Sequence, residues 1–400
     1  MPTLARRGPV SHGPTAATMP RAHDTTRGLS TSQGSGRFTG ALLVVLTLAC
    51  WTTIPLYLAH LKGIPDPASA PGPDGSRPPL VDPWTANGWR YGFSTLLWIP
   101  PLLAAWWWGR WPRGLWRAAL WPSVFNIGAQ ICFGIAPYFV SPGLMTFSLR
   151  LNMVFVTVGA ALLFAAERRI IRTRGFLLGL AMLLAGTALT VLLQPGGLGG
   201  ATGVGVLLSF GSAALYAAYA LSVRTWMHGM PPMLAFAAVS QYTGLALVVL
   251  MLFFGTRGVG PDGAPDVVRG LNALRLPGGA LGAEFGMLLL FAVVGIGLGH
   301  TLYYHSINRL GLAVSAGVVQ LQPVTVSLGA ILIFPNNPEQ HLSGFQWLTG
   351  LLAIAGAGVM LFTQHRLASA DRAPIDEFDD LPVDEGVALV GQSNEPPAKP

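Results

Sequence analysis

Residues 141–175 read SPGLMTFSLRLNMVFVTVGAALLFAAERRIIRTRG, and the fold prediction rests on them. An apolar run covers residues 144–166. As an α-helix, such a run is long enough to cross a bilayer core of ~30 Å. It ends on a basic cluster, and Lys and Arg are concentrated in cytoplasmic loops. The stretch therefore predicts a transmembrane helix whose C-terminal end faces the cytoplasm.

A near-copy of this segment occurs 170 residues later. Residues 148–164 (SLRLNMVFVTVGAALLF) align with residues 318–334 (VVQLQPVTVSLGAILIF), and seven of the 17 positions are identical. Arg150 and Asn152 fall opposite Gln320 and Gln322. An apolar composition raises chance identity, but it does not place paired polar residues in register. We interpret the match as an internal duplication that has kept a polar centre.

The composition is that of a membrane protein. Of the 400 residues, 52% are hydrophobic and 10% are charged, whereas soluble domains carry about 25% charged residues. The net charge of +7 is spread over loops and tails, so we expect no nucleic-acid partner. Cys50 and Cys132 lie in apolar segments, and no metal-binding motif occurs. We therefore predict no disulfide framework, no metal and no cofactor.

The pattern predicts an all-α polytopic membrane protein with ten transmembrane helices. The expected helices lie near residues 39–61, 86–108, 118–140, 142–166, 175–193, 203–223, 231–254, 285–306, 312–334 and 345–363. The predicted parts are a disordered tail (1–37), a five-helix repeat (38–193), a linker (194–202), a second five-helix repeat (203–363) and an acidic disordered tail (364–400). Both tails are too polar to bury a core.

Charge indicates how the two repeats are oriented. With the N-terminus inside, cytoplasmic segments hold 17 of the 24 Lys and Arg residues and outer loops hold five. Because five helices is an odd number, the second repeat must be inverted. The loop after helix 142–166 carries four arginines, and the matching loop 335–344 carries none. We expect two inverted repeats in a bacterial inner membrane, with both termini cytoplasmic.

Arg150 is the first candidate site residue. It lies ~13 Å from the start of its helix, near the bilayer centre, where an arginine costs ~2.5–3.5 kcal/mol and needs a partner. A substrate carboxylate could be that partner, or Arg150 could hydrogen-bond to backbone carbonyls and side-chain amides. Asn152, Gln320 and Gln322 complete the polar centre. They suit a polar or zwitterionic solute, or hydrogen bonds between helices.

Four further residues are candidates for the transport route. His300 aligns with Gln130 at the offset of 170. As a titratable group, it could accept a proton in coupled transport, or it could be a hydrogen-bonded core residue. Trp51 is a candidate cavity wall. Arg90 lies near the outer start of its helix, and we expect it to snorkel to the interface.

A family resemblance rests on four features of the sequence: the segment AAERRIIRTRG at residues 165–175, Pro323 within LQPVTVSLGAILIF, Trp51, and Arg90 within WRYGF. On these features the chain resembles the EamA-like branch of the drug/metabolite transporter superfamily over about residues 38–364. Met153 departs from it, because the first repeat often has proline there. The resemblance implies two inverted five-helix repeats and a carrier of small metabolites, often an exporter.

We predict a secondary transporter that works by alternating access. It would export a small polar, carboxylate-bearing metabolite bound between the helices at 118–140, 142–166, 285–306 and 312–334. The alternatives are a carrier or flippase of lipid-linked cargo and a non-transporting scaffold or sensor. No nucleophile–base set or buried carboxylate pair is evident, so we expect no enzyme. The expected partners are the metabolite and the lipid bilayer, and a homodimer is left open.

Overall fold

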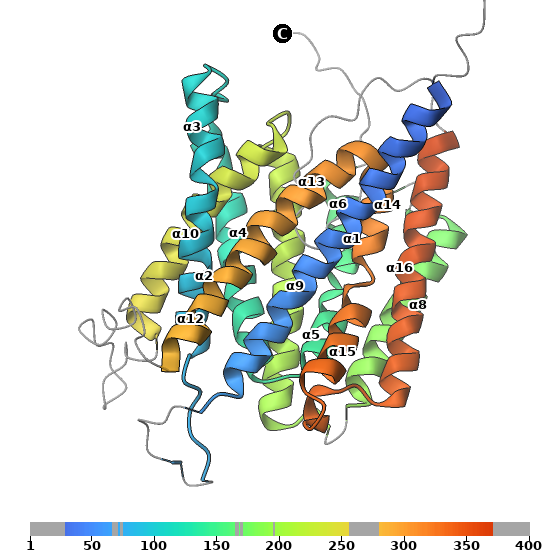
Figure 1. Ribbon diagram of the computed structural model, residues 1–400. Helices are drawn as coiled ribbons and strands as arrows, with labels where there is room; N and C mark the ends of the chain where they lie inside the picture. Colours follow the sequence, from blue (N-terminus) through green and yellow to red (C-terminus); the bar gives the residue numbers. More distant parts are fainter. Residues whose placement is uncertain are drawn as a thin grey trace, which may run out of the picture.

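The computed structural model describes residues 29–65, 71–72, 75–164, 168, 171–194, 197–255 and 280–370. Within these residues the regular elements are helices, packed side by side as one bundle (Figure 1). Residues 1–28 and 371–400, most of the two predicted tails, lie outside the described residues. So do residues 165–167, 169–170 and 256–279 in two predicted loops.

The first half begins with a helix that is longer than predicted. Its elements are α1 (Leu29–Lys62), α2 (Pro83–Leu97), α3 (Ile99–Trp107), α4 (Leu115–Ile135), the short 3₁₀ helix η1 (Ala136–Tyr138), α5 (Pro142–Leu149), α6 (Asn152–Leu163) and α8 (Arg174–Leu192). The helix predicted at 86–108 is divided between α2 and α3. Pro100 and Pro101 cause this division, because neither has the amide N–H that continues a helical ladder.

The second half follows a similar order. Its elements are α9 (Gly200–Trp226), α10 (Pro232–Phe254), α12 (Ala280–Phe291), the π-helical η2 (Ala292–Leu298), α13 (Gly299–Leu310), α14 (Leu312–Val319), α15 (Gln322–Ile333), η3 (Pro338–Gln340) and α16 (Gly344–Ala370). The helix predicted at 285–306 is therefore interrupted by a π-helical segment. Such segments are rare and occur frequently at functional sites.

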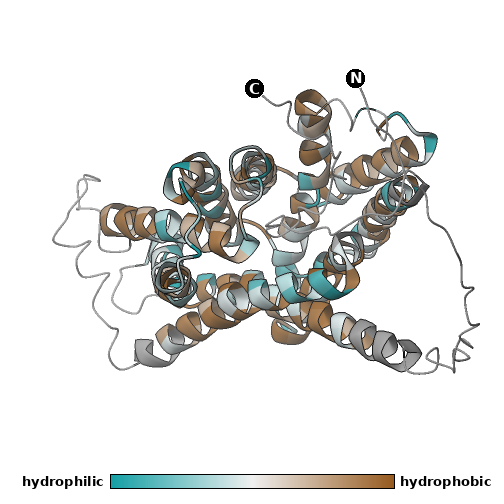
Figure 2. Cartoon of the chain, turned by 90° about the horizontal axis from the view of Figure 1, so that it is seen from above, coloured by the Kyte–Doolittle hydropathy of each residue, from teal (hydrophilic) through white to brown (hydrophobic). Residues whose placement is uncertain are grey.

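By length and composition, nine helices among the described residues can cross a membrane. Neither α2 nor α3 is among them, because each is too short alone. Large apolar side chains are exposed on the outside of the bundle, including Trp107 and Leu332, each 80% exposed, and Phe345, 71% exposed. In the view from above, many helices carry long hydrophobic stretches, with hydrophilic residues between them (Figure 2). The chain is an all-α polytopic membrane protein.

The duplicated stretch folds as two helices in each half, and not as the one continuous helix that we predicted. In the first half α5 and α6 are separated at Arg150 and Leu151, and in the second α14 and α15 are separated at Gln320 and Leu321. All four helix bounds repeat with an offset of 170. At the first break, Leu151 N donates to Ser148 O at 3.2 Å, and at the second, Leu321 N donates to Val318 O at 3.0 Å. Both are tightened i to i−3 bonds.

The two broken helices run in opposite directions. In Figure 1 the chain rises from α5 to α6 and descends from α14 to α15. The packing of the other helices is reciprocal: α1 packs against α13, and α9 packs against α4. Between the halves, α2 packs against α10, α5 against α15 and α8 against α16. The breaks at Arg150 and Gln320 therefore lie on helices that meet between the halves.

The α8–α16 contact is close enough to exclude side chains. A Cβ atom on Gly186 of α8 would lie 2.6 Å from the backbone oxygen of Thr349 and would also overlap the backbone of Ala353. A Cβ atom on Gly179 would lie 2.7 Å from the oxygen of Gly356. Small residues allow membrane helices to approach this closely, and the resulting van der Waals contact holds them together.

We expect Gly186→Ala to lower the free energy of unfolding by about 1–3 kcal/mol, because the added methyl group must push the two backbones apart. Unfolding of the detergent-purified protein by SDS titration would measure the change. Gly358→Ala, on α16, is the matched control, since a Cβ atom there meets nothing within 4 Å. Equal stability of the two variants would contradict the close packing.

Candidate functional site

Arg150 joins the two broken helices. It follows α5, and its side chain is buried, with 4% exposed. Arg150 Nη1 donates to Gln320 Oε1 at 3.0 Å, and Nη2 donates to Gln322 Oε1 at 2.9 Å. Its Nε donates to the backbone oxygen of Thr146 at 3.4 Å. One guanidinium therefore connects the break in the first half to the break in the second. Its acceptors are side-chain amides and a backbone carbonyl, as in the second of our two alternatives for Arg150.

Among the described residues, two polar atoms of the amides around this centre lack a hydrogen-bond partner. Gln322 Nε2 donates to the backbone oxygen of Trp51 at 3.2 Å, which ties α1 to the centre. Gln320 Nε2 and Asn152 Oδ1 are buried and have no hydrogen-bond partner. A buried donor or acceptor without a partner costs about 1–3 kcal/mol. The two atoms can be satisfied by a solute that both accepts and donates hydrogen bonds.

Trp51 and His300 lie in an aromatic cluster beside the centre. Their rings are 5.2 Å apart, and the His300 ring stacks on Phe236 at 4.4 Å. His300 Nδ1 lies 2.8 Å from the backbone oxygen of Ile296, in η2. α13 approaches Trp51 closely, since a Cβ atom on Gly299 would lie 2.6 Å from Trp51 Nε1. This geometry fits a hydrogen-bonded core histidine, and the proton-acceptor role stays a prediction.

Gln130 belongs to a different cluster, around Arg90. Arg90 Nη2 donates to Asn87 Oδ1 at 2.6 Å and to Gln130 Oε1 at 3.3 Å. Asn87 Nδ2 donates to the backbone oxygen of Gln130 at 2.9 Å. Arg90 is 2% exposed, so our expectation that it snorkels to the interface was wrong. Its face of α2 packs against α4, whose amide supplies an acceptor inside the bundle.

Sequence reasoning missed Asn87. Asn87 and Arg90 are three residues apart and therefore share one face of α2. That spacing was the available signal, but the partner on α4 lies 40 residues from Arg90 in the chain. Among the described residues, no group of three or more His, Cys, Asp and Glu side chains could hold a metal ion.

Comparison with known proteins does not assign the chain to a family. No family model matches the chain, and no curated protein matches it. A solved structure described as "Crystal structure of protein" has 18% sequence identity and a TM-score of 0.48, covering 82% of this chain and 98% of that one. A likeness of that size carries no functional argument. The EamA-like resemblance therefore rests on the sequence motifs alone.

We expect Arg150 and Gln322 to be energetically coupled. In a double-mutant cycle of Arg150→Leu and Gln322→Leu, the coupling energy should be about 1.5–3 kcal/mol, because the bond has a charged donor and is buried. SDS unfolding of the wild type, both single variants and the double variant would measure it. Thr190→Val, which changes the α8–α16 interface, is the control for Arg150→Leu, and their effects should add. Additive effects for Arg150 and Gln322 would contradict the bond.

Proposed function

We propose that this membrane protein is a secondary transporter that moves a small polar, carboxylate-bearing metabolite by alternating access. The observation that carries the proposal is the buried guanidinium of Arg150, held by Gln320 and Gln322 where two matching helix breaks meet. Broken helices near the bilayer midplane form the substrate sites of many secondary transporters.

The arrangement of the helices supports two inverted five-helix repeats. The four bounds of α5, α6, α14 and α15 repeat at one offset, and the two pairs run in opposite directions. The reciprocal packing of α1 with α13 and of α9 with α4 accords with a twofold relation between the halves. In this proposal α2 and α3 together make the tenth crossing. The distribution of Lys and Arg favours cytoplasmic termini. A bacterial inner membrane and export as the direction are further parts of the proposal, and export rests on the EamA-like resemblance.

A carboxylate can engage Arg150 by replacing one of its amide acceptors. The oxygens that accept from Arg150 belong to neutral amides. A charged acceptor makes a hydrogen bond about twice as strong, so a carboxylate can displace one of them. The unpartnered Gln320 Nε2 and Asn152 Oδ1 then remain for the neutral part of the solute. In this proposal the solute binds more tightly to the conformation in which an amide has released Arg150, and such a difference in affinity is what a ligand-driven change of conformation requires.

The direct test is solute flux in proteoliposomes. Vesicles loaded with ¹⁴C-labelled amino acids and organic acids should release label faster when they contain the protein than when they are empty. Arg150→Leu should reduce the flux of carboxylates at least about tenfold, the effect of losing about 1.4 kcal/mol. Flux of a labelled lipid alone would favour the lipid-cargo alternative. No flux of any solute would contradict the proposal and favour a scaffold.

A disulfide between α5 and α15 should stop transport, because alternating access requires the halves to move. A Cβ atom on Gly143 would lie 2.6 Å from Ser327 Oγ, so cysteines at the two positions are within reach of a disulfide. In a background with Cys50→Ala and Cys132→Ala, we expect oxidised Gly143→Cys/Ser327→Cys to lose flux and a reductant to restore it. Each single cysteine variant is the control. Full flux with the disulfide closed would show that these helices do not separate.

A further inference from the structure

We infer that Arg90, Asn87 and Gln130 form a second site, between α2 and α4, that binds an oxyanion. The inference rests on the proposed function only in that it takes the bound anion to be the transported solute. The site around Arg90 differs from the Arg150 centre in its hydrogen bonds. All three side-chain nitrogens of Arg150 donate to acceptors, whereas two of the three nitrogens of Arg90 find no acceptor among the described residues.

Arg90 keeps a full positive charge inside the bundle. A guanidinium is not deprotonated in proteins, and this one is 2% exposed. The two side chains that accept from it, Asn87 and Gln130, are neutral amides. Amides satisfy N–H groups, but they do not neutralise the charge. Burying a charge is costly unless it is paired, so the site favours a negatively charged partner.

Arg90 also has donors that no acceptor among the described residues reaches. Its Nε and Nη1 atoms are buried and have no hydrogen-bond partner there. The rings of Tyr91 and Phe133 lie 5.3 and 5.5 Å from the guanidinium carbon and attract the charge through their faces. A ring face offers no oxygen lone pair to an N–H group. An oxyanion supplies both the missing acceptors and the missing charge.

The acidic residue at the start of the same helix already has a structural role. Asp82 Oδ1 accepts from the backbone nitrogens of Trp84 and Thr85, at 2.9 and 3.1 Å, and Oδ2 accepts from Thr85 Oγ1 at 2.6 Å. Oδ1 therefore caps the first turn of α2, where it satisfies backbone amide groups, and Oδ2 is engaged by a hydroxyl. Both oxygens of Asp82 thus have donors other than Arg90, and we take the anion for Arg90 to come from outside the part of the chain that the structure describes.

The polar surface continues beyond Arg90 and limits the kind of solute. Asn126 lies one turn before Gln130 on the same face of α4, ~6 Å along the helix axis. Asn126 Nδ2 donates to Thr243 Oγ1 of α10 at 3.0 Å, and Asn126 Oδ1 is buried without a partner. A solute with an oxyanion for Arg90 and a separate hydrogen-bond donor for Asn126 Oδ1 can satisfy both. Amino acids and hydroxy acids carry both kinds of group.

Binding to the full-length, detergent-purified protein tests the site. The probes are L-glutamate, succinate and inorganic phosphate, with the neutral succinamide as the matched control for succinate. Isothermal calorimetry should give binding of at least one oxyanion to the wild type, and weaker binding of succinamide. Arg90→Gln should weaken oxyanion binding at least about tenfold, and Arg90→Lys, which keeps the charge, should weaken it less.

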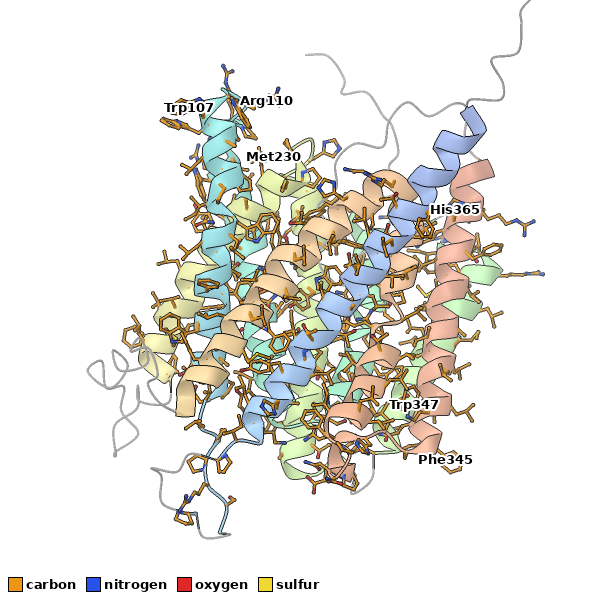
Figure 3. All side chains as sticks on the ribbon, viewed as in Figure 1. Trp107, Arg110, Met230, Phe345, Trp347 and His365 are labelled. Carbon is orange, nitrogen blue, oxygen red and sulfur yellow. The ribbon has the colours of Figure 1, made fainter. Side chains whose placement is uncertain are left out.

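Arg110→Gln is the control for the loss of one positive charge. Arg110 is exposed and lies beyond the end of α3, away from the bundle (Figure 3). This variant should bind like the wild type. Monodispersity in gel filtration and the melting temperature would establish that Arg90→Gln is folded, and Arg90→Lys keeps the test valid if it is not. Binding of phosphate but of neither carboxylate would assign the site to phosphate-bearing solutes.

Three results would overturn the inference. They are wild-type affinity in Arg90→Gln, equal binding of succinate and succinamide, and no binding of any of the three oxyanions to the wild type. Flux measurements separate this failure from failure of the proposed function. If Arg90 binds oxyanions but vesicles show no flux, the transporter proposal fails and the site stands. If flux persists unchanged in Arg90→Gln and binding is also unchanged, the site fails and the transporter proposal stands.

Discussion

The buried guanidinium of Arg150 is the constraint on which the arrangement of the helices depends. An arginine is tolerated in an apolar bundle only where acceptors surround it, and here they come from Gln320 and Gln322 of the other half. Both helix breaks must therefore lie together. Gln322 in turn donates to the backbone of Trp51, so the position of α1 is fixed by the same set of bonds. One charge thereby orders elements that are far apart in the chain.

The two matching pairs of broken helices have the same lengths, but their polar groups differ. The bounds of α5, α6, α14 and α15 repeat at one offset, yet Arg150 stands opposite Gln320. Gln130 and His300 are also related by the offset of 170, and they make different contacts. Gln130 accepts from Arg90, whereas His300 stacks on Phe236 next to a π-helical segment that α4 lacks. The positive charges of the two polar clusters thus belong to the first half.

Hydropathy and the repeat were enough to predict most helices and to group Arg150, Gln320 and Gln322 in one polar centre. Hydrogen bonds from Arg150 to side-chain amides were one of the two alternatives left open for it. The breaks at residues 150–151 and 320–321 were not predicted, because a few polar residues within a long apolar run do not by themselves end a membrane helix. Proline marks only the second break, at Pro323, whereas the first has Met153 there. Pro100 and Pro101 were a signal for the division between α2 and α3, although we predicted one helix there. The burial of Arg90 was not, since it depends on an amide that approaches from a distant helix.

The bonds of Arg150 also determine what a change of conformation must overcome. If the halves separate at α5 and α15, a charged donor and two amides lose partners inside an apolar environment. Each such loss costs about 1–3 kcal/mol, so the empty protein resists separation. A solute that supplies an acceptor for Arg150 and a donor and acceptor for the amides removes most of that cost. In the proposed transporter, opening then depends on the occupant, and a bond that stabilises the bundle also prevents movement of the empty protein.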